Sequence, residues 1–191
     1  MESASGTPTQ HGVSKRGTWR KIHLAIEEKT GQILSQRLTH KDTNDASQLP
    51  ELVQEVQQAG VGVQKVGGDG AYATWECYQI LKKVQVQPMI PARENAALWV
   101  DQQDILLDHP RNQALEQIHQ GGLNAKRKQW KQESGYHRGS KVENTFFRWK
   151  TIQGPAMDAR KMANQQTEAA VKLAVLNRFI QIDTPIAVKV A

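Results

Sequence analysis

One glutamate stands among cations and aromatic residues in the stretch YHRGSKVENTFFRWK, which runs from Tyr136 to Lys150. At helical spacing Glu143 and Lys150, seven residues apart, point in nearly the same direction, two turns from each other. A metal ligand and a phosphate contact could therefore share one face of a helix. The same spacing gathers an apolar stripe from Val142, Phe146 and Trp149.

A second acid, Asp69, lies where a short apolar run meets glycines, in the sequence VGGDGAY. The residue falls at the carboxyl end of a predicted parallel strand, where the loops of open α/β sheets form the ligand crevice. Gly68 and Gly70 would let backbone or metal approach closely. Taken with Glu143, this acid suggests a divalent metal held by carboxylates and acting on a polyphosphate.

Both acids also have purely structural interpretations, which the sequence leaves open. Asp69 could stabilise a strand-to-helix turn through its own side chain. The segment from Ser140 to Glu143 has the spacing of a capping box, in which the glutamate only returns a hydrogen bond to the cap residue.

The charge balance favours a polyanionic partner. Lysine and arginine number 25 against 19 acidic residues, a net charge of +6, and nucleic acid is the leading candidate partner. Basic residues cluster near the start and again in the later third of the chain: Lys15, Arg16, Arg20 and Lys21, then Lys126, Arg127, Lys128, Lys131, Arg138, Lys141, Arg148, Lys150, Arg160 and Lys161. The alternative for each patch is an ordinary solvated surface.

Several classes of protein are disfavoured by what the sequence lacks. Cys77 is the one cysteine, so no internal disulfide can form. Neither a signal peptide nor an apolar run of about 18 residues is present, and we expect a soluble, cytoplasmic protein with no membrane partner. The six histidines include no pair at helical metal-ligand spacing, which argues against zinc. Neither a nucleotide-binding glycine loop nor a nucleophile elbow occurs.

The periodicity predicts an α/β fold. Residues 1–14 have no periodicity and are expected to be a disordered lead-in, with a single domain over 15–191. The predicted elements are a strand hairpin at 19–26 and 32–39, helices at 45–59 and 74–83, a buried strand at 61–68, a strand at 84–90, and helices at 140–152 and 164–180. Strand, helix and strand in succession imply a right-handed parallel crossover. The stretch 91–134 is interpreted as an inserted connection.

These motifs resemble bacterial insertion-sequence transposases of the DDE type, whose catalytic domain is ribonuclease H-like, over residues 11–179. The resemblance runs through the segment SKRGTWRKIHLAI, then GDGAY, then the region of Glu143. It implies that Asp69 is the second catalytic aspartate of an Asp-Gly-Ala-Tyr motif. It also implies that Glu143 is the catalytic glutamate of a Tyr-x2-Arg-x3-Glu-x6-Lys signature that includes Tyr136 and Lys150.

The resemblance carries expectations about function. It implies metal-dependent cleavage of DNA strands and strand transfer, with Mg²⁺ or Mn²⁺ at Asp69 and Glu143. The partners would be double-stranded DNA, at transposon ends and target, and further copies of the chain in the active complex. The expected DNA contacts are Tyr136, Arg138, Lys150, Lys15, Arg16 and Arg20.

Two departures from the family pattern shape these expectations. Gly139 takes the place of the signature's arginine, with Arg138 displaced by one residue. The family's first catalytic aspartate belongs to a central strand before the hairpin, so we expect a chain truncated at its N-terminus, lacking that strand and weakly active or inactive. The nearby acids Glu27, Glu28, Asp42 and Asp45 are expected to be solvated surface groups. The alternatives are a non-catalytic DNA-binding or dominant-negative fragment, and a degraded reading frame.

Overall fold

A computed structural model describes residues 19–93, 96–119, 129–130, 132–133, 136 and 140–182, without the side chains of 118, 119 and 140. The expected lead-in at 1–14 and the candidate DNA contacts Lys15, Arg16 and Arg138 lie outside these residues. None of the described helices is both long and apolar enough to cross a membrane.

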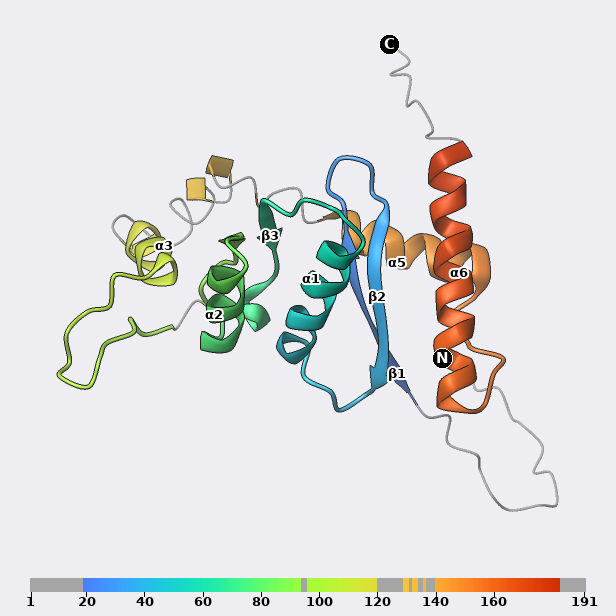
Figure 1. The fold of residues 1–191 in the computed structure, drawn as a ribbon, viewed down its shortest axis with the longest axis horizontal. Helices are drawn as coiled ribbons and strands as arrows, with labels where there is room; N and C mark the ends of the chain where they lie inside the picture. Colours follow the sequence, from blue (N-terminus) through green and yellow to red (C-terminus); the bar gives the residue numbers. More distant parts are fainter. Residues whose placement is uncertain are drawn as a thin grey trace, which may run out of the picture.

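The chain first forms an antiparallel hairpin of β1 (Arg20–Ile26) and β2 (Ile33–His40), which confirms the predicted strands (Figure 1). Gly31 closes the turn with a φ of 77°, in the left-handed region that glycine enters without strain. Alternation along β1 gives the hairpin two faces. Ile22, Leu24 and Ile26 pack on one face against the core around Trp149.

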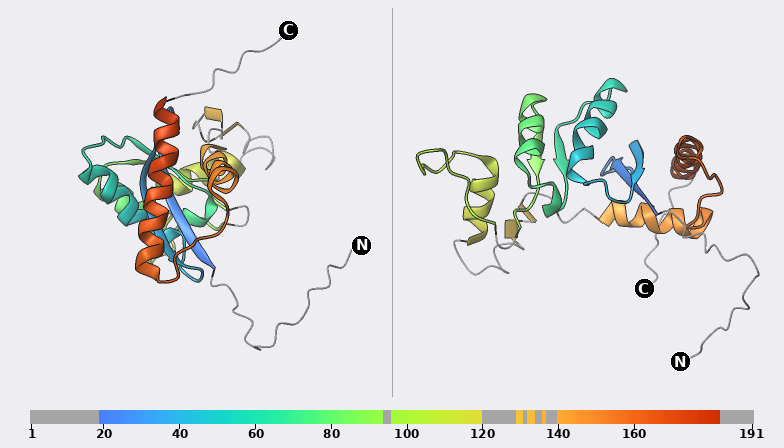
Figure 2. Two further views of the ribbon diagram at one scale, coloured as in Figure 1. Left: turned by 90° about the vertical axis from the view of Figure 1, so that its right-hand side faces the viewer. Right: turned by 90° about the horizontal axis from the view of Figure 1, so that it is seen from below.

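Helices cover both faces of this hairpin. The short η1 (Ala46–Gln48) leads into α1 (Leu49–Gln58), and Pro50 is accommodated in the first turn of α1. Leu52, Val53 and Val56 are buried, as the helical spacing predicted. In the right-hand view of Figure 2, α1 lies on one side of the hairpin and α6 on the other.

The second unit is the predicted strand, helix and strand crossover. Thr74 caps α2 (Trp75–Lys83) by accepting a hydrogen bond from the Cys77 N–H at 3.3 Å. On either side of α2, β3 (Lys65–Gly67) and β4 (Gln87–Met89) pair in parallel. The prediction of a buried strand at 61–68 was wrong, because β3 is three residues long and its ends are exposed. Val61, expected inside, is 37% exposed.

The α/β class is confirmed, but the expected single mixed sheet is not continuous. The described strands form two sheets of two strands each, β1 with β2 and β3 with β4. No described strand is hydrogen-bonded to both β1 and β3, so the pairs remain separate. This also explains the exposure of β3, whose one described neighbour is β4.

The described part of the expected insertion is folded against α2. Residues Trp99 to Leu107 form a loop with one antiparallel bridge, Val100 to Leu106. The buried Asn112, on α3 (Pro110–His119), closes this loop by accepting a hydrogen bond from the Trp99 N–H at 2.9 Å and donating to the carbonyls of Trp99 and Leu107. His109 stacks on Trp75 of α2, with ring centroids 5.6 Å apart. The loop and α3 are therefore anchored to the core.

The last two described elements are α5 (Ser140–Gln153) and α6 (Met162–Ile182), and both helices were predicted. Gly154, with a φ of 78°, ends α5. Ala169, Leu173 and Leu176 of α6 are buried, which confirms the predicted inner face. The opposite face of α6 is not the polar surface that an amphipathic helix should present, since it exposes large apolar side chains.

Candidate active site

Asp69 is separated from the end of β3 by Gly68 and caps the short helix η2 (Gly70–Tyr72). Its Oδ1 accepts a hydrogen bond from the Ala71 N–H at 2.8 Å, so the turn-stabilising interpretation is part of what this residue does. The side chain is nevertheless exposed. An exposed carboxylate at the carboxyl end of a parallel strand can also reach a cation or a ligand.

Glu143 lies in the first turn of α5 and is exposed. On the same helix Trp149 is buried, Phe146 is partly buried and Val142 is 38% exposed, so the expected apolar stripe is only partly covered. Lys150, seven residues further along α5, is also exposed. The capping-box alternative depends on the side chain of Ser140, which lies outside the described side chains.

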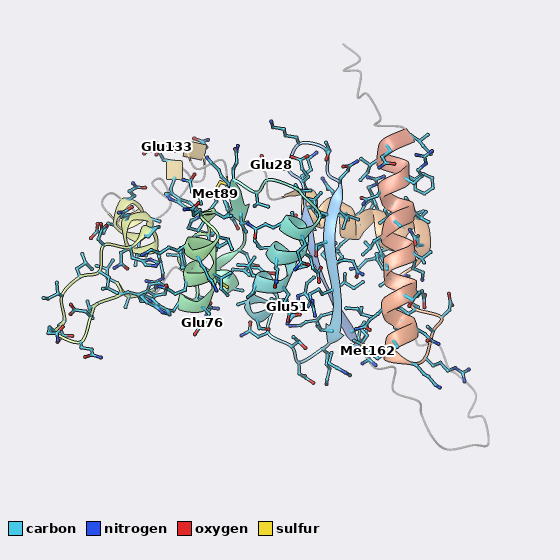
Figure 3. All side chains as sticks on the ribbon, viewed as in Figure 1. Glu28, Glu51, Glu76, Met89, Glu133 and Met162 are labelled. Atoms are coloured by element: carbon cyan, nitrogen blue, oxygen red, sulfur yellow. The ribbon has the colours of Figure 1, made fainter. Side chains whose placement is uncertain are left out.

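The fold sets Asp69 and Glu143 on separate elements. Figures 1 and 2 show that the N-terminal end of α5 lies towards β3, whereas its C-terminal end lies beside α6. Among the described residues no group of three or more histidine, cysteine, aspartate or glutamate side chains could hold a metal ion. The glutamates labelled in Figure 3 likewise belong to separate segments: Glu28, Glu51, Glu76 and Glu133.

The described candidates for DNA contact differ in their availability. Lys150 is exposed. Tyr136 packs in a small cluster with Ala114 and Trp130, its ring centroid 6.0 Å from that of Trp130. Arg20 joins the hairpin to α6, because its Nε donates to Gln165 Oε1 at 2.9 Å. A phosphate contact by Arg20 would therefore involve a side chain that already stabilises the fold.

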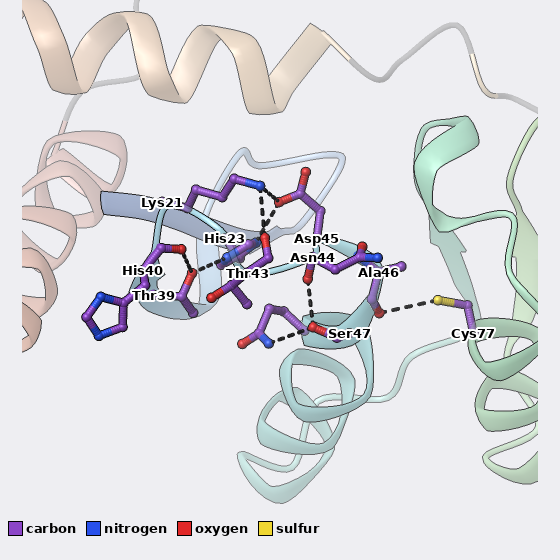
Figure 4. Close-up of polar contacts among 11 residues, drawn as sticks. Lys21, His23, Thr39, His40, Thr43, Asn44, Asp45, Ala46, Ser47 and Cys77 are labelled. Atoms are coloured by element: carbon purple, nitrogen blue, oxygen red, sulfur yellow. Dashed lines mark hydrogen bonds and ion pairs between the residues drawn. The ribbon is translucent and has the colours of Figure 1, made fainter. Parts of the chain in front are cut away.

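A polar cluster that the sequence did not indicate joins β1 to β2 and to Asp45, the residue before η1 (Figure 4). Asp45 lies 3.2 Å from Lys21 Nζ and 3.5 Å from His23 Nδ1, whereas it was expected to be a solvated surface acid. The other ring nitrogen of His23, Nε2, lies 2.8 Å from Thr39 Oγ1. Burial lowers the pKa of His23, an effect that Asp45 opposes and that Lys21 and Arg37 reinforce. His23 is therefore held as neutral imidazole at neutral pH.

Tyr72 connects this cluster to the region of Asp69. Burial, together with the smaller effect of the carboxylates of Asp45 and Asp69, raises the pKa of Tyr72 to about 12. Two acids far apart in sequence thus act on one phenol, which stays protonated at neutral pH. The only sequence signal for this arrangement was the presence of Asp45 just before an apolar helix, which is also the signature of a helix cap.

Comparison with known proteins gives one family. A family model described as a transposase DDE domain matches residues 2–178, most of the chain. No solved structure matches the chain.

Proposed function

The chain belongs to the family of transposases with a DDE domain, and from that premise we propose metal-dependent cleavage and transfer of DNA strands at the ends of a mobile element. The observation that carries the proposal is the position of two exposed carboxylates within the matched region. Asp69 follows a parallel strand, and Glu143 shares the exposed side of α5 with Lys150. Family membership indicates the class of reaction, and these residues are the candidates for metal binding and phosphate contact.

Asp69 and Glu143 are the proposed ligands of Mg²⁺ or Mn²⁺. Their oxygen donors suit such hard cations, and both side chains are exposed. When bound, the metal would activate the attacking oxygen and stabilise the leaving oxygen of a phosphodiester. Because the described residues offer no cluster of three ligating groups, we expect weak metal binding and weak activity.

The remaining roles in the proposal concern DNA. Lys150 would orient a phosphate beside Glu143, since both extend from the exposed side of α5. The further proposed contacts are Tyr136, Arg138, Lys15, Arg16 and Arg20. The active complex would contain more than one copy of the chain and would act on DNA in a bacterial cytoplasm.

Plasmid nicking with the full chain tests this function. The substrate is a supercoiled plasmid that carries the DNA flanking the chain's own gene, with Mg²⁺ or Mn²⁺. We expect weak nicking that is abolished by Glu143→Gln and by Asp69→Asn. The matched controls are Glu133→Gln and Asp104→Asn, which change exposed acids elsewhere and should leave nicking intact. Robust nicking that survives both site substitutions would overturn the assignment.

A second candidate function is DNA binding without cleavage. It is favoured by the lack of a three-ligand cluster in the described region, together with the exposed cations Lys141 and Lys150. Each phosphate neutralised should then contribute a slope of about 0.9 to the fall of log K with log salt. A DNA affinity that does not change with salt concentration would exclude this second function. Nicking that depends on Glu143 would exclude it in favour of strand cleavage.

A further inference from the structure

The turn that follows β3 lies beside the segment that follows β4. Because β3 and β4 are parallel and Gly67 is paired with Met89, both strands end at the same edge. The Gly68 N–H extends this pairing by donating to the Met89 carbonyl at 3.4 Å. Figure 3 labels Met89 at the end of β4. Two segments therefore leave this edge as close neighbours, one with Asp69 and the other with Arg93.

Arg93 is hydrogen-bonded to the turn that contains Asp69. Its Nε donates to the Gly70 carbonyl oxygen at 3.0 Å. The two segments are in close contact, since a Cβ atom added to Gly70 would lie 3.3 Å from Arg93 Cγ and 3.5 Å from the Pro91 carbonyl oxygen. Consecutive Cα atoms are about 3.8 Å apart, so the guanidinium group is bound one residue away from the proposed metal ligand Asp69.

The backbone that leads to Arg93 is fixed in the core. Ile90 and Ala92 are 1% and 2% exposed, and the Tyr78 hydroxyl donates to the Ile90 carbonyl at 3.3 Å. Arg93 is the first exposed residue after this buried segment. Its side chain therefore starts from a rigid point and is held again at Nε, which lowers the entropy cost of binding a ligand.

Most of the hydrogen-bond donors of Arg93 remain available. The bond to Gly70 uses Nε, and within the described part of the chain the amino groups Nη1 and Nη2 form no hydrogen bond and no ion pair. Asp69 and Arg93 are not ion-paired with each other either, since the carboxylate of Asp69 accepts from the Ala71 N–H. A cation that served only to neutralise Asp69 would be paired with it. Both groups are instead free to meet a ligand.

The ligand that suits this arrangement is a phosphodiester. The paired amino groups of an arginine match the spacing of phosphate oxygens and form two hydrogen bonds at once. A free carboxylate beside them would repel a small anion, whereas a DNA strand is held by many other phosphate contacts as well. The net charge of +6 favours such a polyanion.

We propose that Arg93 binds a phosphate of the DNA strand that lies against Asp69, with Nη1 and Nη2 as the donors. The hydrogen bond from Nε to Gly70 holds the guanidinium group in place. The proposal rests on the proposed function, because it takes Asp69 to mark the position of the DNA. It adds a phosphate contact on the Asp69 side of the site to the contact of Lys150 on α5.

DNA binding in EDTA tests this contact without metal and without turnover. The full chain is titrated into a short fluorescent duplex from about 0.05 to about 0.2 M salt, and anisotropy gives the affinity. Arg93→Gln should weaken binding by about tenfold and lower the slope of log K against log salt by about 0.9, because one phosphate contact is lost. The loss should be the same for duplexes of different sequence. Arg178→Gln removes the same charge from an exposed position on α6 and should change the affinity by less than about twofold.

Arg93→Lys separates a phosphate contact from a purely structural role. Lysine keeps the charge but lacks the fork that binds Gly70 and a phosphate together. A phosphate contact predicts a salt slope near that of the wild type and an affinity between those of the wild type and Arg93→Gln. If Arg93 only holds the turn, both substitutions should weaken DNA binding equally, and that result would overturn the proposal.

Asp69→Asn locates the phosphate. Without metal the carboxylate of Asp69 repels a phosphate bound at Arg93, so Asp69→Asn should strengthen DNA binding by about twofold. In the Arg93→Gln background the same substitution should have little effect, because the phosphate is no longer held there. An equal gain in both backgrounds would mean that Arg93 and Asp69 do not face the same phosphate, and would contradict the proposal.

These measurements separate the contact from the proposed reaction. Arg93→Gln with the affinity and salt slope of the wild type would overturn the contact and leave nicking through Asp69 and Glu143 untouched. A chain that fails to nick DNA, but loses affinity and salt slope in Arg93→Gln, would overturn the reaction and support the contact. A wild-type chain without affinity for DNA would contradict both.

Discussion

Asn177 of α6 forms two hydrogen bonds with the backbone of Ile33, a residue 144 positions earlier in the chain. Its Oδ1 accepts from the Ile33 N–H at 2.8 Å and its Nδ2 donates to the Ile33 carbonyl at 2.7 Å. The amide thus takes the place of a neighbouring strand at the start of β2. This pair fixes α6 to the hairpin and so determines which face of α6 points outward.

Removing this clamp should destabilise the protein. Asn177→Ala leaves the Ile33 N–H and carbonyl without their partner, and we expect the free energy of unfolding to fall by about 2 kcal/mol. The matched control, Asn164→Ala, changes an exposed residue on the same helix and should have an effect within about 0.5 kcal/mol. Urea denaturation followed by circular dichroism measures both, and equal effects would contradict the clamp.

We expect the buried His23 to lower the free energy of unfolding in mildly acidic solution. Since burial lowers the pKa of His23 from its usual value of 6.5, the unfolded chain binds the proton more readily than the folded one. Stability should therefore fall as the pH falls below 6.5, until the lowered pKa of the folded state is passed. In denaturation at a series of pH values, His23→Gln should reduce this slope.

The contrary outcome for His23 is simple to state. A pH dependence of unfolding between neutrality and mild acid that His23→Gln leaves unchanged would contradict the assignment to this residue.

We expect protonation of Glu168 to cause a second loss of stability, at lower pH. Hydrogen bonds from Lys172 and from the N–H groups of Ala159 and Asp158 lower the pKa of Glu168 to about 2, from 4.5. A lowered acid pKa gives stability that is fully present above 4.5 and is lost as the pH falls towards 2. Glu168→Gln should be less stable at neutral pH and should lose less on acidification. Glu116→Gln, on α3, is the control; an unchanged acid transition in Glu168→Gln would refute the assignment.

Much of the local structure could be predicted because each element has a clear period. The alternation of Ile22, Leu24 and Ile26 identified β1, and Thr74 before an apolar helix identified the start of α2. Asp69 after a strand and Glu143 within a helix were likewise placed on the right kinds of element.

What could not be predicted depends on contacts between distant segments. Nothing local distinguishes Asn177 from a surface asparagine, and nothing local shows that Asp45 meets Lys21 and His23. Periodicity also gave no sign that β3 would have a single described neighbour, so its burial was overestimated. Spacing cannot say how far apart the carboxyl groups of Asp69 and Glu143 lie, because that distance is set by the packing of α5.

Binding of Mn²⁺ therefore tests the central claim most directly, because it needs neither a DNA substrate nor turnover. Free Mn²⁺ is followed by electron paramagnetic resonance in titrations of the wild type, Asp69→Asn, Glu143→Gln and the double variant. Two ligands of one ion are coupled, so each single substitution should weaken binding by about tenfold or more and the double variant should add little. Wild-type affinity in either single variant, or effects that simply add in the double variant, would contradict a shared metal site.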